Sequence, residues 1–452
     1  MTLEFTPQFN QALSRMENGK AFVFVTGRAG TGKSTLLRHF VLNTKKNTPV
    51  LAPTGVAALN VDGETIHRFF KIPPAVTPDI ARREALERKN LGLYRKINIL
   101  VIDEISMVRA DLLDSVDAFL RTARRNDMPF GGVRVVGIGD LHQLPPVVTS
   151  DESPTFSQYY ATPYFFSSHT YRQLAQINMV DFVELDKVYR QKDQDFIDLL
   201  NSIRNRTVTE EGLRTLNARL TYDQPPRDAI ILTPTNAAAD YINRSRMEEL
   251  ADEPRAFEGS VQGRFNERDL PTDENLELKI GARVMCVAND QRGRYVNGSL
   301  GWVRGLNQET VTVELDGKPG TVEIETFTWT VFRTKYVKRT DTLEREEIGS
   351  FEQLPLRLAW AVTIHKSQGK TFDKVTLDLG RGAFAAGQVY VALSRCTSLE
   401  GLHLVKPVTL QQIKLDESIV KYLDRFQNPD VPIDEDAQDD PFIEEPRYIE
   451  EE

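Results

Sequence analysis

The chain has 452 residues, 40% hydrophobic and 27% charged, a composition typical of a globular protein with several domains. It contains no run of ~18 apolar residues, and its first residues, MTLEFTPQF, have neither a basic nor an apolar signal region, so we expect a cytoplasmic protein without membrane contact. Cys286 and Cys396 lie far apart outside any C-x-x-C motif, and the six histidines lack metal-ligand spacing, which argues against a disulfide or zinc site.

The net charge of −9 is unevenly distributed. Residues 430–452 contain 11 acidic residues and one arginine, a net of −10, which leaves +1 for the remaining chain. A nearly neutral body can carry local basic patches that bind phosphates. We expect the acidic segment 429–452 to be disordered and available to a protein partner.

A phosphate-binding signature lies near the N-terminus. Residues 22–25 are apolar and predict a buried strand, and the pattern Gly27-x-x-x-x-Gly32-Lys33-Ser34 follows at once and leads into a helix-compatible segment. Here the glycines let backbone N–H groups surround a phosphate chain, the lysine reaches the β- and γ-phosphates, and the serine binds Mg²⁺. An accidental glycine-rich turn is the alternative, which the flanking strand and helix disfavour. The predicted nucleotide contacts in this loop are Gly27, Ala29, Gly30, Thr31, Gly32, Lys33, Ser34 and Thr35.

The next segment predicts a second strand and an insertion. Residues 49–52 predict the strand, and Pro53-Thr54-Gly55 follows it as a turn. Residues 63–70 then combine a histidine and two phenylalanines with an arginine. Such a cluster, taken alone, is more often core packing than a binding site. Residues 71–96 bring three prolines and a charged, helix-forming run, which predicts an inserted subdomain.

Two carboxylates, Asp103 and Glu104, end the apolar strand predicted from residue 99. In P-loop proteins one such acid holds the metal and the other activates the attacking water. Two acids after a strand can also be a helix cap, but their combination with the phosphate-binding loop favours catalysis. A further strand, 133–138, leads to Gln143, which we expect at the same edge of the sheet.

The alternation of strands and helices begins again near residue 183, after which residues 276–345 show alternating strands with the turn signals Asn297-Gly298 and Asp316-Gly317. We therefore predict an α/β protein in two main units with a small inserted β-barrel. The predicted division is a first unit 1–182 with the insertion 71–96, a second unit 183–275 and 346–428, the β-barrel 276–345 and the acidic segment 429–452.

Taken together, the motifs of this sequence resemble those of a known family. The ordered motifs GRAGTGKS, APTGVAAL, TIHRFF, VIDEIS, PFGGVRVVGIGDLHQLPPV, VYRQ, TIHKSQGKTFDKV and YVALSRCTSLEGL resemble those of the PIF (petite integration frequency) helicases, relatives of RecD and Dda in superfamily 1. The segment 111–132 is similar to the one that separates this family from other superfamily members. The resemblance, over about residues 5–425, implies two RecA-like P-loop domains with parallel sheets, ATP between them, single-stranded DNA across their top, a wedge at 71–96 and an SH3-like β-barrel.

The resemblance also implies catalytic roles. Lys33, Ser34, Asp103, Glu104 and Gln143 match the family's phosphate, Mg²⁺, general-base and γ-phosphate-sensing positions, and Ser34 and Asp103 are the implied metal ligands. Arg190 and Arg395 match arginine fingers, and Gly369 is a further expected nucleotide contact. A guanidinium from the opposite domain stabilises the transferring phosphoryl group only when the cleft closes. A lone arginine would otherwise be read as part of a surface ion pair.

The DNA contacts implied by the same motifs combine a lysine, hydroxyls and backbone N–H groups for phosphates with aromatic rings for bases. They are Pro53, Thr54, Gly55, His67, Phe69, Phe70, Asn236, His365, Lys366, Ser367 and Thr371. Arg68 stands where relatives more often have serine. The family's adenine-reading glutamine matches Phe9, which lacks an amide, while Gln8 and Gln11 are nearby.

The resemblance therefore implies an ATP- and Mg²⁺-dependent helicase, monomeric, that moves 5′→3′ on single-stranded DNA and unwinds tailed or forked duplexes, with G-quadruplex DNA as a further candidate substrate. One alternative is a single-strand translocase that removes proteins without unwinding duplexes. Another is a nucleotide-binding adaptor that acts through its acidic segment. Glu104, Arg190 and Arg395 argue against the adaptor, because an adaptor needs no hydrolytic residues.

Overall fold

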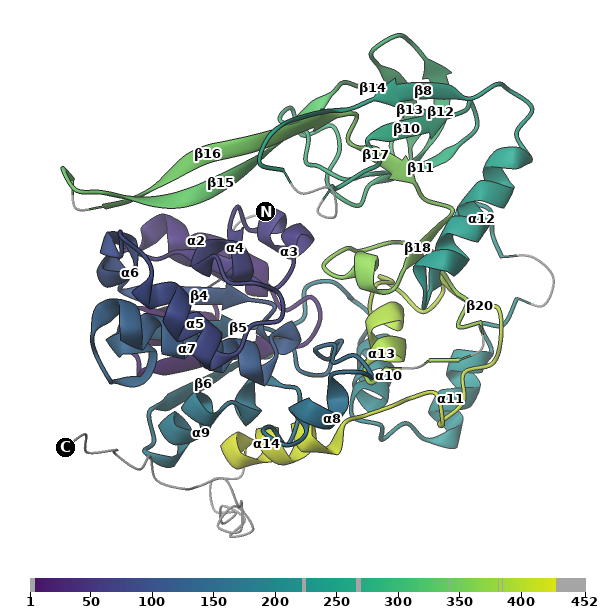
Figure 1. The fold of residues 1–452 in the computed structure, drawn as a ribbon. Coiled ribbons are helices and arrows are strands. Elements are labelled where there is room, and N and C mark those ends of the chain that lie inside the picture. The colour runs from purple at the N-terminus through teal and green to yellow at the C-terminus, as the bar shows by residue number, and fades with distance from the viewer. Residues whose placement is uncertain are drawn as a thin grey trace, which may run out of the picture.

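Two parallel sheets and a group of antiparallel strands make up the computed structural model, which describes residues 5–221, 225–265, 270–340, 342–380, 382–383 and 385–427 (Figure 1). The acidic segment 429–452, predicted to be disordered, lies outside the described residues. Across the described part of the chain, no helix has the length and apolar character needed to cross a membrane.

The first sheet has six parallel strands in the order β3-β2-β4-β5-β1-β6. Along β1, Phe22 and Phe24 join the core on one face, and Val23 and Val25 join the core on the other. This burial on both faces explains the continuous apolar runs in its sequence. The strands are β1 Phe22–Gly27, β2 Val50–Ala52, β3 Glu64–Thr65, β4 Ile99–Asp103, β5 Arg134–Ile138 and β6 Val180–Leu185.

Helices cover both faces of this sheet. The helices α1 and α2 pack on one face, and α5, α7 and α9 on the other. The helical segments are α1 Pro7–Asn18, α2 Lys33–Asn43, α3 Gly55–Asn60, α4 Ile66–Phe70, α5 Pro78–Leu86, α6 Gly92–Lys96, η1 Ile105–Met107, α7 Ala110–Arg124, η2 Pro129–Gly132, α8 Ser153–Phe156, η3 Phe165–Ser167 and α9 His169–Gln176.

The second sheet has four parallel strands in the order β18-β7-β19-β20. Its strands are β7 Ile230–Thr233, β18 Ala361–Thr363, β19 Val375–Leu377 and β20 Leu402–Leu404. The accompanying helical segments are α10 Gln194–Arg204, α11 Glu210–Asn217, α12 Asn236–Glu248, η5 His365–Ser367, α13 Gln388–Leu393 and α14 Glu417–Gln427. The prediction of an α/β fold with parallel sheets is confirmed.

Antiparallel strands form three small sheets above the parallel ones in Figure 1. The strands are β8 Arg255–Glu258, β9 Ser260–Gly263, β10 Asn275–Leu278, β11 Arg283–Cys286, β12 Leu300–Leu306, β13 Val311–Leu315, β14 Thr321–Ile324, β15 Phe327–Val337, β16 Thr342–Gln353 and β17 Leu356–Leu358. They extend beyond the predicted barrel 276–345 on both sides. The short strands β8 and β9 are mostly exposed, so their sequences show little hydrophobic alternation. The domain boundaries and the SH3-like label stay predictions.

The long hairpin formed by β15 and β16 lies over the first sheet unit (Figure 1). The carboxylate of Glu64, at the start of β3, accepts hydrogen bonds from the backbone N–H of Thr334 at 2.6 Å and from its hydroxyl at 2.5 Å. The backbone N–H of Leu343 donates to the side chain of Asn47 at 3.3 Å. These contacts fix the hairpin against the first unit.

The insertion 71–96 is more deeply integrated than its charged sequence predicts. Ala81 and Ala85 on α5 are fully buried against α7, because their small side chains allow the two helices to approach closely. Arg88, in the charged run, donates to the hydroxyl of Tyr94 at 2.5 Å and lies over the Phe119 ring. The helix α5 is therefore packed on the first unit, and the interpretation of 71–96 as a wedge stays a prediction. The following α6 contacts the hairpin.

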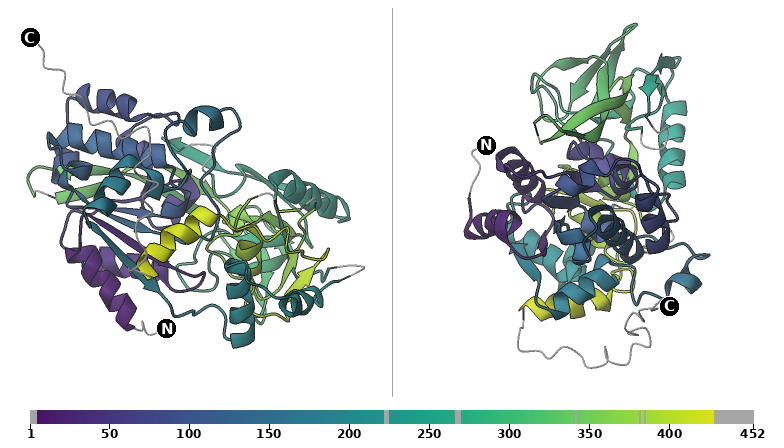
Figure 2. Two further views of the ribbon diagram at one scale, coloured as in Figure 1. Left: turned by 90° about the horizontal axis from the view of Figure 1, so that it is seen from below. Right: turned by 60° about the vertical axis from the view of Figure 1, so that its left-hand side comes forward.

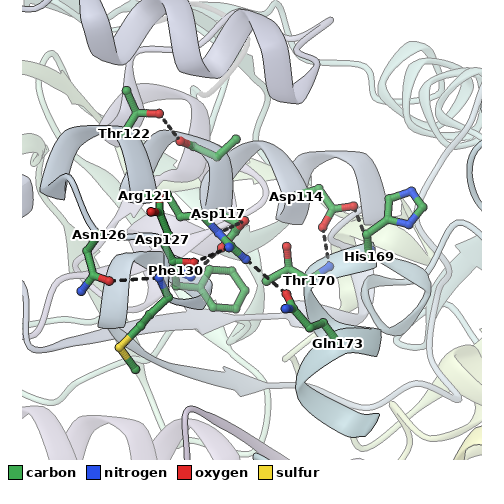
Figure 3. Close-up of polar contacts among 12 residues, drawn as sticks. Asp114, Asp117, Arg121, Thr122, Asn126, Asp127, Phe130, His169, Thr170 and Gln173 are labelled. Atoms are coloured by element: carbon green, nitrogen blue, oxygen red, sulfur yellow. Dashed lines mark hydrogen bonds and ion pairs between the residues drawn. The ribbon is translucent and has the colours of Figure 1, made fainter. Parts of the chain in front are cut away.

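The segment 111–132, which carries the family-specific part of the resemblance, forms a structural network (Figure 3). The buried carboxylate of Asp114 accepts from the backbone N–H groups of His169 at 2.9 Å and Thr170 at 3.0 Å, at the start of α9. Asp117 accepts from Arg121 at 2.7 Å and from the backbone N–H of Phe130 at 2.5 Å. Both carboxylates thus join α7 to neighbouring segments instead of facing a ligand.

The helix α14 follows the second sheet in sequence but packs against the first unit (Figure 2). The Tyr422 ring stacks on Phe166 with centroids 4.2 Å apart, and its hydroxyl pairs with that of Tyr171. This packing ties the end of the second unit to the first.

We expect Tyr422→Ala to lower the free energy of unfolding by about 3–5 kcal/mol, because a buried ring is lost and the cavity persists. Tyr422→Phe keeps the ring and leaves only the Tyr171 hydroxyl unpaired, at a cost of about 1–3 kcal/mol. Denaturant unfolding of both variants measures the difference. Equal losses would show that ring packing of α14 contributes nothing.

Candidate nucleotide and nucleic-acid site

The loop between β1 and α2 has the form of a phosphate cradle. Gly32, the N-cap of α2, has a φ of 89°, in the left-handed region that favours glycine. The ammonium of Lys33 donates to the carbonyls of Gly27 at 2.6 Å and Arg28 at 3.0 Å. Burial lowers the pKa of Lys33, and the carboxylates of Asp140 and Glu104 oppose that shift. A helix N-terminus and a buried cation thus lie together.

The other predicted loop residues occupy two environments. The backbone N–H of Ala29 donates to the Tyr390 hydroxyl at 3.1 Å, and the Thr31 hydroxyl donates to the Arg28 carbonyl at 2.9 Å. Ser34 and Thr35 are exposed on the first turn of α2. Gly369 follows η5, on the side of the second sheet.

The acid pair lies at the end of β4. Glu104 has a φ of 50°, a left-handed conformation that costs energy for any residue other than glycine and is often found at functional sites. Burial and the neighbouring Glu104 raise the pKa of Asp103 to about 7. Burial likewise raises the pKa of Glu104, although Lys33 and Arg395 oppose the shift. A buried acid pair of this kind favours either a bound proton or a cation.

The available donors suit Mg²⁺. Ser34 and Asp103 offer hard oxygen ligands, and Mg²⁺ is usually held in nucleotide sites by one or two protein oxygens together with phosphates and water. Among the described residues no group of three or more His, Cys, Asp or Glu side chains could hold a metal by itself. The residues therefore fit a metal that is bound together with a nucleotide.

Asp140, just after β5, connects the γ-phosphate-sensing candidate to the second unit. Its carboxylate accepts from the Gln143 amide at 3.2 Å and lies 3.3 Å from the guanidinium of Arg204 on α10. Burial alone would raise the pKa of Asp140, but Arg204, His142 and Lys33 outweigh it and hold that pKa well below its usual range. Asp140 is therefore ionised and fixed between the two sheet units.

The two candidate arginine fingers lie together in the junction between the sheet units. Arg190 donates to the Ser394 carbonyl at 3.0 Å, and Arg395 donates to the Val391 carbonyl at 2.9 Å and the Ser394 hydroxyl at 2.8 Å. Burial lowers the pKa of Arg190 to about 10, and burial together with Arg190 lowers that of Arg395 to about 9. Within the described ranges, neither guanidinium has an ion pair with a carboxylate, so a bound anion would relieve their repulsion.

Close backbone approaches hold this junction together. The backbone N–H of Tyr189 donates to the Gly30 carbonyl at 2.9 Å. A Cβ on Gly387, at the start of α13, would lie 2.3 Å from the His142 carbonyl oxygen, so only glycine fits there. The structure thus brings together the phosphate loop, the acid pair, Gln143 and both arginines.

The two sheet units present similar strand-to-helix junctions on the side facing the antiparallel strands (Figure 1). Thr54 caps α3 by accepting from Ala57 N–H, and Thr235 caps α12 by accepting from Ala238 N–H, each at 3.3 Å. Pro53 and Gly55 flank the first cap and are half-buried, whereas Asn236 follows the second and is exposed. These polar helix starts suit phosphate contacts.

The predicted contacts around η5 are only partly accessible. Lys366 and Thr371 are exposed, and His365 is half-buried with a pKa lowered by burial. Ser367 is fully buried, and its hydroxyl donates to the Ile364 carbonyl at 2.7 Å. A phosphate contact through that hydroxyl is therefore not available in this structure, which corrects the prediction for Ser367.

The predicted aromatic stacking surface is also corrected. The rings of Phe69 and Phe70 are 3% and 0% exposed and pack against each other and Tyr94 in the core of the first unit. They cannot offer stacking planes to bases here. The core-packing alternative explains both residues, while His67 beside them stays half-buried.

Sequence reasoning missed the residues that join the two units. Arg204 and Tyr390 make the contacts with Asp140 and Ala29 described above, across the junction. Tyr390 lies in the YVALSR motif, which was a reason to consider it as a site residue. Nothing near Arg204 in the sequence indicates its partner. Near the loop, Gln8 donates its amide to Asp186 at 2.9 Å, while Phe9 is buried.

Comparisons with known proteins agree on one family. The family model described as PIF1-like helicase matches residues 5–213. The chain is 32% identical over 438 residues to the ATP-dependent DNA helicase Pif1 of Bdellovibrio bacteriovorus, covering 94% of this chain and 93% of that protein. It is 37% identical over 417 residues to the ATP-dependent DNA helicase PIF1 of Rattus norvegicus, of which it spans 60% of the length.

Solved structures give the same result. An unliganded Pif1 from Bacteroides sp is 37% identical, with a TM-score of 0.84 and coverage of 94% of this chain and 98% of that one. The Bacteroides sp Pif1 in complex with ADP-AlF4 is 36% identical, with a TM-score of 0.85 and coverage of 95% and 98%. The Bacteroides Pif1 bound to ssDNA, 37% identical with coverage of 94% and 98%, gives a TM-score of 0.67.

Proposed function

Because this chain belongs to the PIF1-like helicase family, we propose that it is an ATP-dependent DNA helicase. One observation supports the proposal most directly: the phosphate loop and the acid pair of the first sheet unit meet two arginines at the junction. Arg395 is buried and belongs to the second unit, and Arg190 lies half-buried between β6 and α10. Within the described residues neither guanidinium has an ion pair with a carboxylate. ATP is the proposed substrate, and hydrolysis is coupled to the contact between the units because each unit supplies part of the site.

The chain's own residues suggest a division of labour in hydrolysis. The loop N–H groups and Lys33 hold the β- and γ-phosphates, and Glu104, whose pKa is raised by burial, accepts a proton from the attacking water. Arg190 and Arg395 stabilise charge on the transferring phosphoryl group. Mg²⁺, held by Ser34 and Asp103, would supply charge neutralisation. Gln8, whose amide donates to Asp186 in this structure, is our candidate for adenine recognition.

Single-stranded DNA is the proposed partner, on the face formed by Thr54, His67, Asn236, Lys366 and Thr371. Relatives have been solved with ssDNA and with forked dsDNA. Those structures have TM-scores of 0.67 and 0.66, against 0.84 for the unliganded relative, which supports a change of arrangement when DNA binds. The 5′→3′ direction, the cytoplasmic location, the monomeric state and a partner for the acidic segment stay predictions.

DNA-stimulated ATP hydrolysis tests this proposal. We expect turnover to rise strongly on adding single-stranded DNA, since DNA on both units favours the closed junction. A nucleotide-binding adaptor would show no turnover with or without DNA. A translocase that cannot unwind would show the stimulation but would leave a tailed duplex intact.

Contact between α6 and the hairpin offers a test of the wedge interpretation. The ammonium of Lys96 lies 5.6 Å from the ring centroid of Tyr336, and that ring also borders Gly92. We expect Tyr336→Ala to free α6 from the hairpin, so that unwinding of a tailed duplex falls severalfold while single-strand-stimulated ATPase changes little. Parallel assays of both activities measure this. Equal loss of the two would mean that the contact only supports the fold.

A further inference from the structure

A basic pocket lies where the hairpin meets the first sheet unit. It has a volume of about 350 Å³, and its lining among the described residues is Arg68, Lys71, Arg264, Phe265, Arg333 and Ile348, of which four are cationic and none is acidic. Arg68 lies on α4, and Lys71 is the C-terminal cap of that helix. Arg264 directly follows β9, and Arg333 lies on β15. The pocket thus has one wall from each part of the molecule.

The structure holds these like charges close together. Partial burial lowers the pKa of Lys71, and the nearby Arg88, Arg333 and Arg264 lower it further, with only Glu64 opposing. Arg88 is committed elsewhere, to Tyr94 and Phe119. Arg333 pairs with Glu346 on the neighbouring strand, so its charge is partly balanced. Lys71 and Arg264 are exposed, and among the residues that the structure describes neither forms an ion pair with a carboxylate.

The walls of the pocket cannot easily separate to relieve this repulsion. The hydrogen bonds from Thr334 to Glu64 hold β15 against β3, immediately before α4. The backbone N–H of Arg264 donates to the Ile348 carbonyl at 2.8 Å and fixes the opposite wall. A pocket that confines positive charge in this way attracts a phosphate, which bridges both walls and neutralises them.

The location of the pocket indicates which phosphate it receives. It adjoins α4, which carries His67, on the face where the two strand-to-helix junctions present Thr54 and Asn236. The proposed nucleotide phosphates belong to a different element, the loop of Lys33 at the start of α2.

We propose that this basic pocket, Arg68–Lys71–Arg264–Arg333, captures a backbone phosphate of DNA when a strand first meets the protein. The inference rests on the proposed DNA helicase function. Because capture precedes any rearrangement, the pocket accelerates association more than it slows dissociation. Recognition is independent of base sequence, since guanidinium and ammonium groups contact only the phosphodiester.

Stopped-flow fluorescence with a labelled oligothymidylate tests the proposal on the full chain. We expect the double variant Lys71→Gln/Arg264→Gln to associate roughly fivefold to tenfold more slowly at low salt, with a shallower salt dependence and a little-changed dissociation rate. Neither side chain makes a hydrogen bond or ion pair within the described part of the chain, so we expect the melting temperature to be unchanged.

Two matched variants control for charge and position. Lys71→Arg/Arg264→Lys keeps both charges and should associate like the wild type. Arg214→Gln removes an exposed arginine on α11, far from the pocket (Figure 1), and should also leave association unchanged. If Arg214→Gln slowed association equally, the change in association rate would be due to the net charge of the protein and not to the pocket, and the proposal would be overturned.

Other outcomes would reassign the pocket. Association of Lys71→Gln/Arg264→Gln at the wild-type rate, or a change in dissociation alone, overturns the capture role. If inorganic phosphate raises the melting temperature of the wild type but not of that variant, while association is unaffected, the pocket binds free phosphate. If deleting residues 430–452 abolishes the difference, its occupant is the acidic segment. Absence of DNA-stimulated ATPase in the wild type would refute the helicase proposal, whereas association rates still test the pocket.

Discussion

Arg395→Ala is expected to lower kcat of DNA-stimulated ATP hydrolysis by roughly 10³-fold, the effect typical of a lost arginine finger. Arg395 is 1% exposed. Burial and the neighbouring Arg190 lower the pKa of its guanidinium, and the carboxylate of Glu104 offsets part of that shift. We propose that this pair of arginines stabilises the charge that develops on the transferring phosphoryl group. The KM for ATP should change far less than kcat, because the arginine acts mainly in the transition state.

A purely structural arginine would behave differently. Its loss would lower the melting temperature and leave kcat of the folded fraction near the wild-type value. Because Arg395→Ala also removes the hydrogen bonds to Val391 and Ser394, its melting temperature should fall in either case, and kcat of the folded fraction is the quantity that decides. Arg395→Lys keeps the charge but not the fork of donors, so we expect partial recovery. Exposed Arg214→Ala is the matched control, and steady-state kinetics of the three variants decide between the two roles.

Lys33→Ala is expected to reduce ATP hydrolysis to the detection limit while single-stranded DNA still binds. The ammonium lies against the loop carbonyls of Gly27 and Arg28, within the cradle formed by the start of α2. Without it, the β- and γ-phosphates lose their nearest cation on the first unit. Phosphate release assays and fluorescence anisotropy with labelled DNA measure the two properties separately.

The control for this variant is Lys45→Ala, which removes an exposed lysine just beyond α2. It should hydrolyse ATP like the wild type. Turnover in Lys33→Ala comparable to that of Lys45→Ala would mean that the loop does not hold the phosphates. Loss of DNA binding together with hydrolysis would instead indicate that the first unit no longer folds.

Features of the site that are local in sequence could be predicted. The loop around Lys33, the acids after β4 and Gln143 follow buried strands that lie next to one another in the sheet, so their common edge follows from the strand-to-helix pattern. The family assignment rested on the order of such motifs, and the comparisons confirm it. The narrower placement beside RecD and Dda stays a prediction.

Contacts between distant segments could not be predicted. The bond from Ala29 to Tyr390 and the pair formed by Asp140 and Arg204 depend on how two separately folded sheets dock. The sequence around Tyr390 and around Arg204 does not indicate which residue each of them contacts. The same holds for α14, whose Tyr422 returns to the first unit through aromatic packing alone.

Predictions made from residue type alone were wrong where the burial of a side chain decides whether it contacts a ligand or packs in the core. Phenylalanine suits both a stacking surface and a core, and the structure puts Phe69 and Phe70 in the core. The charged run of α5 suggested a solvated insertion, yet the alanines at positions 81 and 85 let it pack tightly on α7. One buried stripe on a short helix is too weak a signal against so many charges.

Unwinding of duplexes with a 5′ or a 3′ single-stranded tail tests the proposed function most directly, with ATP hydrolysis followed in the same samples. We expect the wild type to separate the 5′-tailed duplex with ATP and Mg²⁺ and to leave the 3′-tailed duplex largely intact, whereas Lys33→Ala should separate neither duplex. Stimulated hydrolysis without strand separation on either substrate would contradict it and identify a translocase.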